Sequence, residues 1–345
     1  MLAFVALAVL IYVLPAFVSD FRAQQFAYVG IYTLALIGLN VLTGYTGQIS
    51  LGHGAFMAIG GYTTAILMAG NEQFSGGVKD IWTIPVAGVV AGAVGFLFGL
   101  PALRLSGLYL ALATFAIAVA TPAVIKKFEG FTGGGGGINL FGLPELTAGI
   151  TPVNVLGFEL NFNNWLYVLC WTVTLVGYVL AWLLLRGRTG RAFRAVRDSE
   201  TAALSSGVNL ATYKTLAFAV SAAYCGVAGS LFAIATTFVN PDTFPIALSI
   251  FLLVGVVVAG LGSLVGAIAG AIFIYYMQIS WAQGMDKVIP DWLPILGDVD
   301  TSSPGAPAVV FGVILILLMF VLPGGVSGLV ARLGAIARRG YHRSP

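Results

Sequence analysis

Polar side chains and glycines gather in residues 40–61, inside a region that is otherwise apolar. No charged residue lies from 23 to 71, which places this stretch within a membrane or close to its inner edge. Non-helical backbone at that depth is tolerated against protein or a water-filled cavity, and broken helices with short polar side chains often mark transport sites. The stretch therefore predicts part of a substrate passage, with the candidate residues Asn40, Tyr45, Thr46, Gln48, Ser50 and His53.

The same residues also admit a structural interpretation. Gly52 and Gly54 would let two helix backbones approach closely in lipid. We favour the passage for the stretch as a whole, while both interpretations stay open for its individual residues. His53 alone, between two glycines, is more typical of a packing residue than of a proton relay.

A second set lies in residues 186–213, where arginines recur every three residues from 188 to 197. Apolar residues at roughly helical spacing accompany them, among them Phe193, Val196 and Ala203. This pattern predicts one or two short amphipathic helices at the membrane face. An apolar stripe ringed by arginine is typical of a docking surface. The alternative is a solvated loop that only sets orientation.

A third set comprises Gly262, Gly266 and Gly270, which form two overlapping G-x-x-x-G motifs. Such motifs let transmembrane helices pack backbone to backbone. We interpret this set as tight helix packing rather than as a functional site.

The composition limits what these sets could do. The 345 residues include 16 Lys and Arg and 13 Asp and Glu, or 8% charged, against about 25% in soluble domains. With 59% hydrophobic residues, a water-soluble globular enzyme is excluded, and a net charge of +3 does not favour nucleic acid. Two cysteines and two histidines offer no metal cluster, so we expect no metal and no cofactor. The chain has no P-loop and no catalytic set, so we expect no enzymatic activity and an external source of energy.

The elements that position these sets follow from the uncharged intervals, because charges are costly in hydrocarbon. A span needs about 20 apolar residues. The sequence predicts an all-α, polytopic membrane protein with about ten spans, the first uncleaved rather than a signal peptide. For 247–282, a re-entrant pair is the alternative. The predicted spans are 1–18, 26–43, 50–70, 83–100, 107–125, 164–185, 214–238, 247–260, 264–282 and 306–323.

Orientation follows from the distribution of lysine and arginine. The arginines of 186–214 and those of the tail, 324–345, are expected in the cytoplasm, and the acidic stretch 284–305 is expected outside. Both termini then lie in the cytoplasm. Lys126 and Lys127 fall outside, against the general rule.

Several motifs together resemble the LivM-type permeases of branched-chain amino acid ABC importers, within the LivH/LivM family. The resemblance covers roughly 26–323, and the Gly107–Thr114 segment favours the LivM branch. The motifs are Gly44-Tyr45-Thr46-Gly47-Gln48-Ile49-Ser50-Leu51-Gly52-His53-Gly54-Ala55-Phe56, Gly107-Leu108-Tyr109-Leu110-Ala111-Leu112-Ala113-Thr114, the Gly190–Gly207 loop and Gly260-Leu261-Gly262-Ser263.

This resemblance implies the ABC importer permease fold, with one transmembrane permease domain over 1–345 that forms half of a passage in the bacterial inner membrane. The implied partners are a second, LivH-like permease, two cytoplasmic ATPases of the LivG/LivF type, a periplasmic binding protein and membrane lipid. ATP hydrolysis would belong to the partners. Residues 186–213 would be the coupling loop that contacts an ATPase, although Thr201 replaces the acid of the superfamily's E-A-A-x-x-x-G pattern. The implied coupling residues are Arg191, Phe193, Arg194, Arg197, Asp198, Glu200, Ala202, Ala203 and Gly207.

Other interpretations remain open. The same type of permease could carry urea, short amides or organic acids. A stand-alone channel or secondary carrier is a further alternative, and a membrane enzyme would need a reactive cluster that we do not find.

Overall fold

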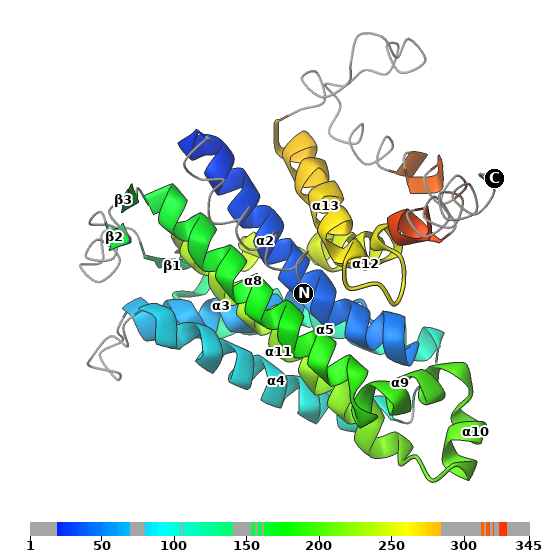
Figure 1. The fold of residues 1–345 in the computed structure, drawn as a ribbon. Helices are drawn as coiled ribbons and strands as arrows, with labels where there is room; N and C mark the ends of the chain where they lie inside the picture. Colours follow the sequence, from blue (N-terminus) through cyan, green and yellow to red (C-terminus); the bar gives the residue numbers. More distant parts are fainter. Residues whose placement is uncertain are drawn as a thin grey trace, which may run out of the picture.

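Long apolar helices make up most of the chain (Figure 1). The computed structural model describes residues 19–69, 80–103, 105, 107–140, 153–155, 158–160, 162–283 and short stretches between 312 and 329. The long helices are α2 (Asp20–Asn40), α3 (His53–Ala69), α4 (Thr83–Ala102), α5 (Leu108–Lys127), α8 (Phe162–Arg186), α11 (Leu210–Thr236), α12 (Ile246–Ala259) and α13 (Gly266–Gln283). The short helices are the π-helix η2 (Val41–Tyr45), η3 (Asp80–Trp82), α6 (Glu129–Thr132), η4 (Gly134–Gly136), α9 (Arg188–Asp198), α10 (Glu200–Ser205) and η5 (Pro241–Thr243).

Each predicted span between 26 and 282 coincides with one of these long helices. By length and composition, 6 helical segments of the described residues could cross a membrane; α3 and the described part of α13 are shorter. The prediction of a polytopic helical membrane protein is confirmed. The first span, 1–18, and most of the last, 306–323, lie outside the described residues, so the total of ten stays a prediction.

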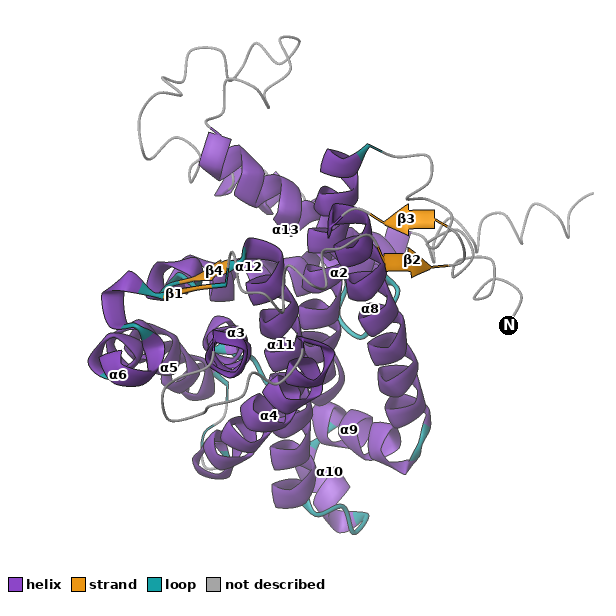
Figure 2. Cartoon of the chain, turned by 90° about the vertical axis from the view of Figure 1, so that its left-hand side faces the viewer, coloured by secondary structure: helices purple, strands orange, loops and turns teal. Residues whose placement is uncertain are grey.

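α11 lies at the centre of the bundle and packs against α4, α3 and α2 (Figure 2). Glycines make the close approaches possible, since a Cβ on Gly60 of α3 would collide with the backbone of Gly226 in α11. Gly229 of α11 lies equally close to the backbone of Met57. Small residues at these crossings replace the side-chain interdigitation of a soluble core.

α2 and α8 run side by side in the same direction along one flank of the bundle (Figure 1). Thr174 Oγ1 donates a hydrogen bond to the Gly30 carbonyl at 2.9 Å, and Trp171 Nε1 donates to the Phe26 carbonyl at 3.0 Å. These bonds fix α8 against the first half of α2.

α12 and α13 form a helical hairpin that packs on α2. Gly270 lies against the backbone of Gly255, which agrees with the predicted helix packing. Gly262 differs from that prediction, because it lies in the turn before α13 with φ of 82° rather than in a helix. Only glycine adopts this conformation without strain.

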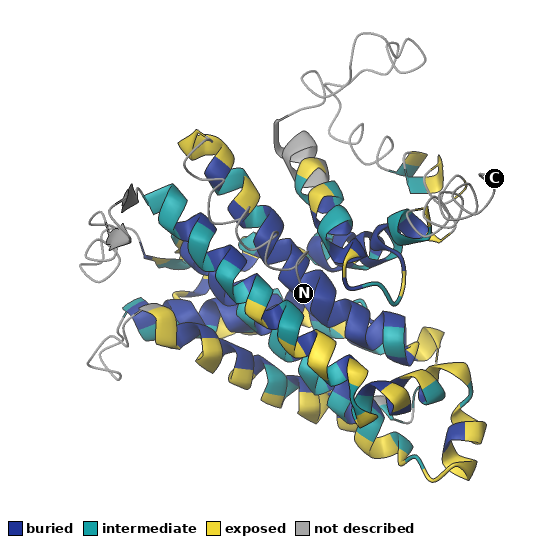
Figure 3. Ribbon diagram, viewed as in Figure 1, coloured by how far each residue is buried: buried dark blue, intermediate teal, exposed yellow. Residues whose placement is uncertain are grey.

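The two ends of the bundle differ. At one end lie α9 and α10, whose outer surface is exposed (Figure 3). At the other end, β1 (Ile138–Asn139) pairs antiparallel with β4 (Phe238–Val239), and β2 (Val153–Val155) pairs with β3 (Phe158–Leu160).

Candidate functional site

The break between α2 and α3 is the first part of the site. The α2 helix widens into the π-helix η2, and irregular backbone then runs over 47–52 before α3 begins at His53. Gly38 lies against Tyr224, and His53 contacts Ser221, both near the middle of α11. The irregular backbone therefore turns back into the protein interior, as the sequence predicts for 40–61.

Hydroxyl groups satisfy the backbone of this break. Thr114 Oγ1 of α5 accepts a hydrogen bond from the Leu51 amide at 2.9 Å. Ser249 Oγ of α12 accepts one from the Gly54 amide at 2.9 Å. Within the break, Thr43 donates to the Gln48 carbonyl at 3.1 Å. Buried amides and carbonyls need such partners, so these hydroxyls hold the non-helical backbone in place.

Several predicted passage residues also bond within the chain. Thr46 Oγ1 donates to the Leu42 carbonyl at 2.5 Å, and Gln48 Nε2 donates to Thr46 Oγ1 at 3.1 Å. Tyr45 is half-buried and lies near Arg194. Ser50 is fully buried, whereas Ile49 beside it is 43% exposed. Contact of any of these residues with a cargo stays a prediction.

His53 is fully buried among aromatic rings. Its Nε2 lies 2.7 Å from Ser221 Oγ, and its ring packs at 5.7 Å between centroids from Phe56 and at 6.3 Å from Phe218. Within the described part of the chain, its Nδ1 has no hydrogen-bond partner. This environment suits the packing residue that we favour from the sequence.

The second part of the site is α9, which lies across one end of the bundle as an amphipathic helix (Figure 1). On the inner face of α9, three residues are buried: Ala192, Phe193 and Val196. The Phe193 ring packs edge-on against Tyr213 of α11, with 6.3 Å between the ring centroids. Arg191 and Arg194 are exposed. The predicted amphipathic pattern is thus realised.

α10 continues this surface. Ser199 caps it, because its hydroxyl accepts a hydrogen bond from the Ala202 amide at 3.2 Å. The buried Lys214 ammonium of α11 donates a hydrogen bond to Glu200 at 2.6 Å. Among the remaining predicted coupling residues, Ala203 is buried, whereas Asp198, Ala202 and Gly207 are exposed.

The structure brings the two parts together at the end of α2. Arg197 Nη1 of α9 donates a hydrogen bond to the Gly44 carbonyl at 2.6 Å. The buried Asn40 donates from Nδ2 to the Ser263 carbonyl at 2.7 Å and accepts from the Gly262 amide at 2.8 Å. Nothing in the sequence indicates that the 260–263 turn meets this stretch, because the partners lie more than 220 positions apart.

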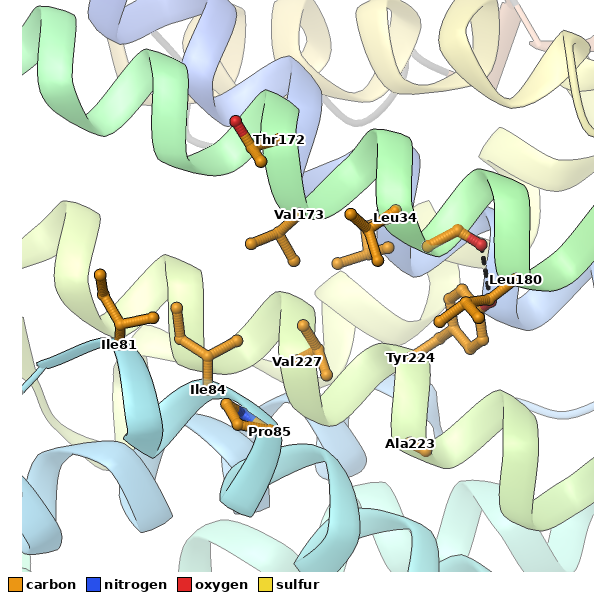
Figure 4. Close-up of a pocket in the computed structure, with 12 residues that line it drawn as sticks. Leu34, Ile81, Ile84, Pro85, Thr172, Val173, Leu180, Ala223, Tyr224 and Val227 are labelled. Atoms are coloured by element: carbon orange, nitrogen blue, oxygen red, sulfur yellow. Dashed lines mark hydrogen bonds between the residues drawn. The ribbon is translucent and has the colours of Figure 1, made fainter. Parts of the chain in front are cut away.

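A pocket of about 420 Å³ opens between α4, α8 and α11 (Figure 4). Its lining is apolar. The two hydroxyl groups in the lining already donate hydrogen bonds to backbone carbonyls, Tyr224 to Gly177 at 2.7 Å and Thr172 to Val168 at 2.6 Å. It includes none of the predicted passage residues and offers nothing to the charged groups of a zwitterion. In the part of the chain that the structure describes, no group of three or more metal-ligating side chains occurs.

A bundle of long apolar helices with a buried, interrupted helix and an arginine-bearing helix across one end defines a polytopic membrane protein with the features of a transporter subunit. Residues 22–322 match the family model described as "Branched-chain amino acid transport system / permease component". The chain belongs to this family.

Individual relatives agree with this family. The chain is 37% identical over 285 residues to the "High-affinity branched-chain amino acid transport system permease protein LivM" of Escherichia coli K12, covering 78% of this chain and 66% of the relative. The Salmonella typhimurium LivM is 36% identical over 260 residues, covering 71% and 60%. The E. coli LivH is 25% identical over 307 residues, covering 86% and 91%. The chain thus spans two thirds or less of the length of these LivM relatives. No solved structure matches it.

Proposed function

We propose that the chain is a transmembrane permease subunit of an ATP-binding cassette importer, forming half of a passage for branched-chain amino acids. The family model and the printed names of the LivM and LivH relatives support this function. Permease subunits are not enzymes by themselves, so ATP hydrolysis belongs to partner subunits. The alternative cargoes, urea, short amides and organic acids, have no support among these relatives.

The observation that carries the proposal is the placement of α9. Its apolar face is held by the bundle, and Arg191 and Arg194 are exposed at the end where the broken helix α2 also finishes. A subunit that is driven by a separate motor needs such a firmly seated contact surface. We assign Arg191, Arg194, Asp198 and Ala202 to contact with an ATPase.

The cargo needs a passage without fixed counter-charges. The broken stretch supplies hydroxyls, amides and exposed backbone between apolar helices, which suits a zwitterion with an aliphatic side chain. We assign Tyr45, Thr46 and Gln48 to this route, beside the exposed Gly47 and Ile49. Five of the six candidate residues are buried in this structure: Asn40, Thr46, Gln48, Ser50 and His53.

The complete importer would contain a second permease of the same family, two cytoplasmic ATPases and a periplasmic binding protein. It would lie in the bacterial inner membrane with α9 and both termini in the cytoplasm. Residues 1–345 would form one permease domain, with 186–213 as the coupling loop and 324–345 as a cytoplasmic tail.

Uptake by the assembled importer tests the cargo. We expect proteoliposomes with all subunits to accumulate tritiated leucine only with ATP and the binding protein, and excess isoleucine or valine to suppress this uptake. Competition by urea or acetamide but not by valine would contradict the cargo. Leucine flux through the isolated chain, driven by a gradient alone, would contradict the importer.

Charge reversal tests the docking surface. The double variant Arg191→Glu/Arg194→Glu should lose co-purification of the ATPases and ATP-dependent uptake while remaining in the membrane. The control is Arg22→Glu/Lys127→Glu, which alters two exposed residues at the opposite end of the bundle. Equal losses in both variants, or none in the first, would count against docking on α9.

A further inference from the structure

Arg197 differs from the other arginines of α9 in what it contacts. Its guanidinium turns toward the bundle and donates to the Gly44 carbonyl at 2.6 Å. This carbonyl belongs to the last turn of η2, where the chain leaves the helix and carbonyls lack intrahelical partners. A cation there makes a charge-assisted hydrogen bond at the negative end of the helix dipole.

Asn40 and Gly262 also pack closely against Gly44. A Cβ at this position would collide with the Asn40 carboxamide and lie 2.5 Å from the Gly262 amide. Asn40 itself holds the 260–263 turn by two hydrogen bonds, one to the Ser263 carbonyl and one from the Gly262 amide. The end of α2, the α12–α13 turn and the tip of α9 therefore meet around one peptide group.

The backbone of the break adds a second contact. Gly47, with φ of 73°, lies against the aliphatic part of Arg197, so that a Cβ on Gly47 would be 3.4 Å from Arg197 Cγ. A displacement of α9 must then either carry the 44–47 segment with it or break this hydrogen bond and this packing.

We propose that Arg197 is a mechanical link that transmits movements of α9 to the break in α2 and, through Asn40, to the α12–α13 turn. This inference rests on the proposed importer function. Arg197 then acts as a positioning residue for coupling and is not part of the surface that binds the ATPase, unlike Arg191 and Arg194.

The first test compares Arg197→Gln with the control Arg22→Gln, at an exposed arginine of the opposite end of the bundle, in the assembled importer. Arg197→Gln should keep ATPase co-purification and ATP hydrolysis but lower leucine transported per ATP by about tenfold or more, as expected for loss of a charge-assisted hydrogen bond. Arg22→Gln should leave this ratio unchanged. A parallel fall of co-purification and uptake in Arg197→Gln would make it a docking residue and overturn the link, as would an unchanged ratio.

A second variant tests whether a covalent bond can replace the contact that the guanidinium makes. A Cβ on Gly47 would lie 3.9 Å from the Arg197 Cβ, within the range for a disulfide. The double variant Gly47→Cys/Arg197→Cys should therefore transport when oxidised, because the disulfide replaces the link, and should be uncoupled after reduction. Oxidation that blocks transport would show that α9 and the break must slide past each other, and would overturn the proposal.

The two hypotheses fail in different ways. If the unaltered importer shows no ATP-dependent leucine uptake, the proposed function is wrong whatever Arg197 does. If the unaltered importer transports and both Arg197 variants behave like it, only the mechanical link is wrong.

Discussion

Hydroxyl side chains from distant helices hold the irregular residues 47–52 and the first turn of α3 in the bundle. Thr114 and Ser249 accept hydrogen bonds from the Leu51 and Gly54 amides, at 2.9 Å in both cases. An amide without such a partner in a membrane interior would cost several kcal/mol. The polar side chains of this region therefore supply hydrogen-bond partners for the backbone, besides any role in contact with a cargo.

Replacing Thr114 by valine tests this role at constant shape. Thr114→Val should lower the stability by about 1–3 kcal/mol, because the partly buried Leu51 amide loses its acceptor. The measurement is the thermal melting of the purified chain in detergent. Thr121→Val is the matched control, since its hydroxyl bonds the Ile117 carbonyl in its own helix. Equal melting temperatures for both variants would contradict the role of Thr114.

The sequence indicates where the break lies, because polar residues and glycines stand out in an uncharged, apolar region. It does not indicate which groups they meet, since the acceptors for Leu51 and Gly54 lie 63 and 195 positions away. Glu200 illustrates the same limit. The sequence shows an acid displaced by one position from the family pattern, whereas the structure shows a bond to Lys214.

At the scale of elements, α9 is seated by a few apolar contacts. Gly190 lies so close to the Leu185 carbonyl that no side chain would fit, which sets the sharp turn from α8 into α9. Phe193 then fills the space beneath α9, beside Tyr213. The amphipathic spacing predicts such a helix, but the direction in which it lies follows from this turn and from Arg197.

Truncating Phe193 should loosen α9 without removing any charge. A buried phenylalanine replaced by alanine costs about 3–5 kcal/mol, because the truncation leaves a cavity beneath the helix. We expect Phe193→Ala to speed tryptic cleavage at Arg191 and Arg194, measured by mass spectrometry of the membrane-bound chain. Leu183→Ala, at a 53% exposed site on α8, is the control. Unchanged cleavage in Phe193→Ala would mean that other contacts seat the helix.

At the scale of the whole molecule, the two ends of the bundle carry different charges. The α9–α10 end exposes arginines, whereas Lys126 at the opposite end lies 3.8 Å from Asp242 and both side chains are exposed. An exposed pair of this kind contributes little to stability, but it places acid beside the basic residues that go against the positive-inside pattern. The arginine-rich end is therefore the better guide to orientation.

Cysteine labelling of whole cells tests this orientation. Lys127→Cys should react with a membrane-impermeant maleimide in spheroplasts, and Arg191→Cys should react only in inside-out vesicles. The native Cys170 and Cys225 give a silent background, because both are fully buried. Labelling of Arg191→Cys in spheroplasts would place α9, the end of α2 and the 260–263 turn together on the outside, since contacts with Arg197 and Asn40 join them. No cytoplasmic motor could then reach the break, and both the importer function and the link through Arg197 would fail with one observation.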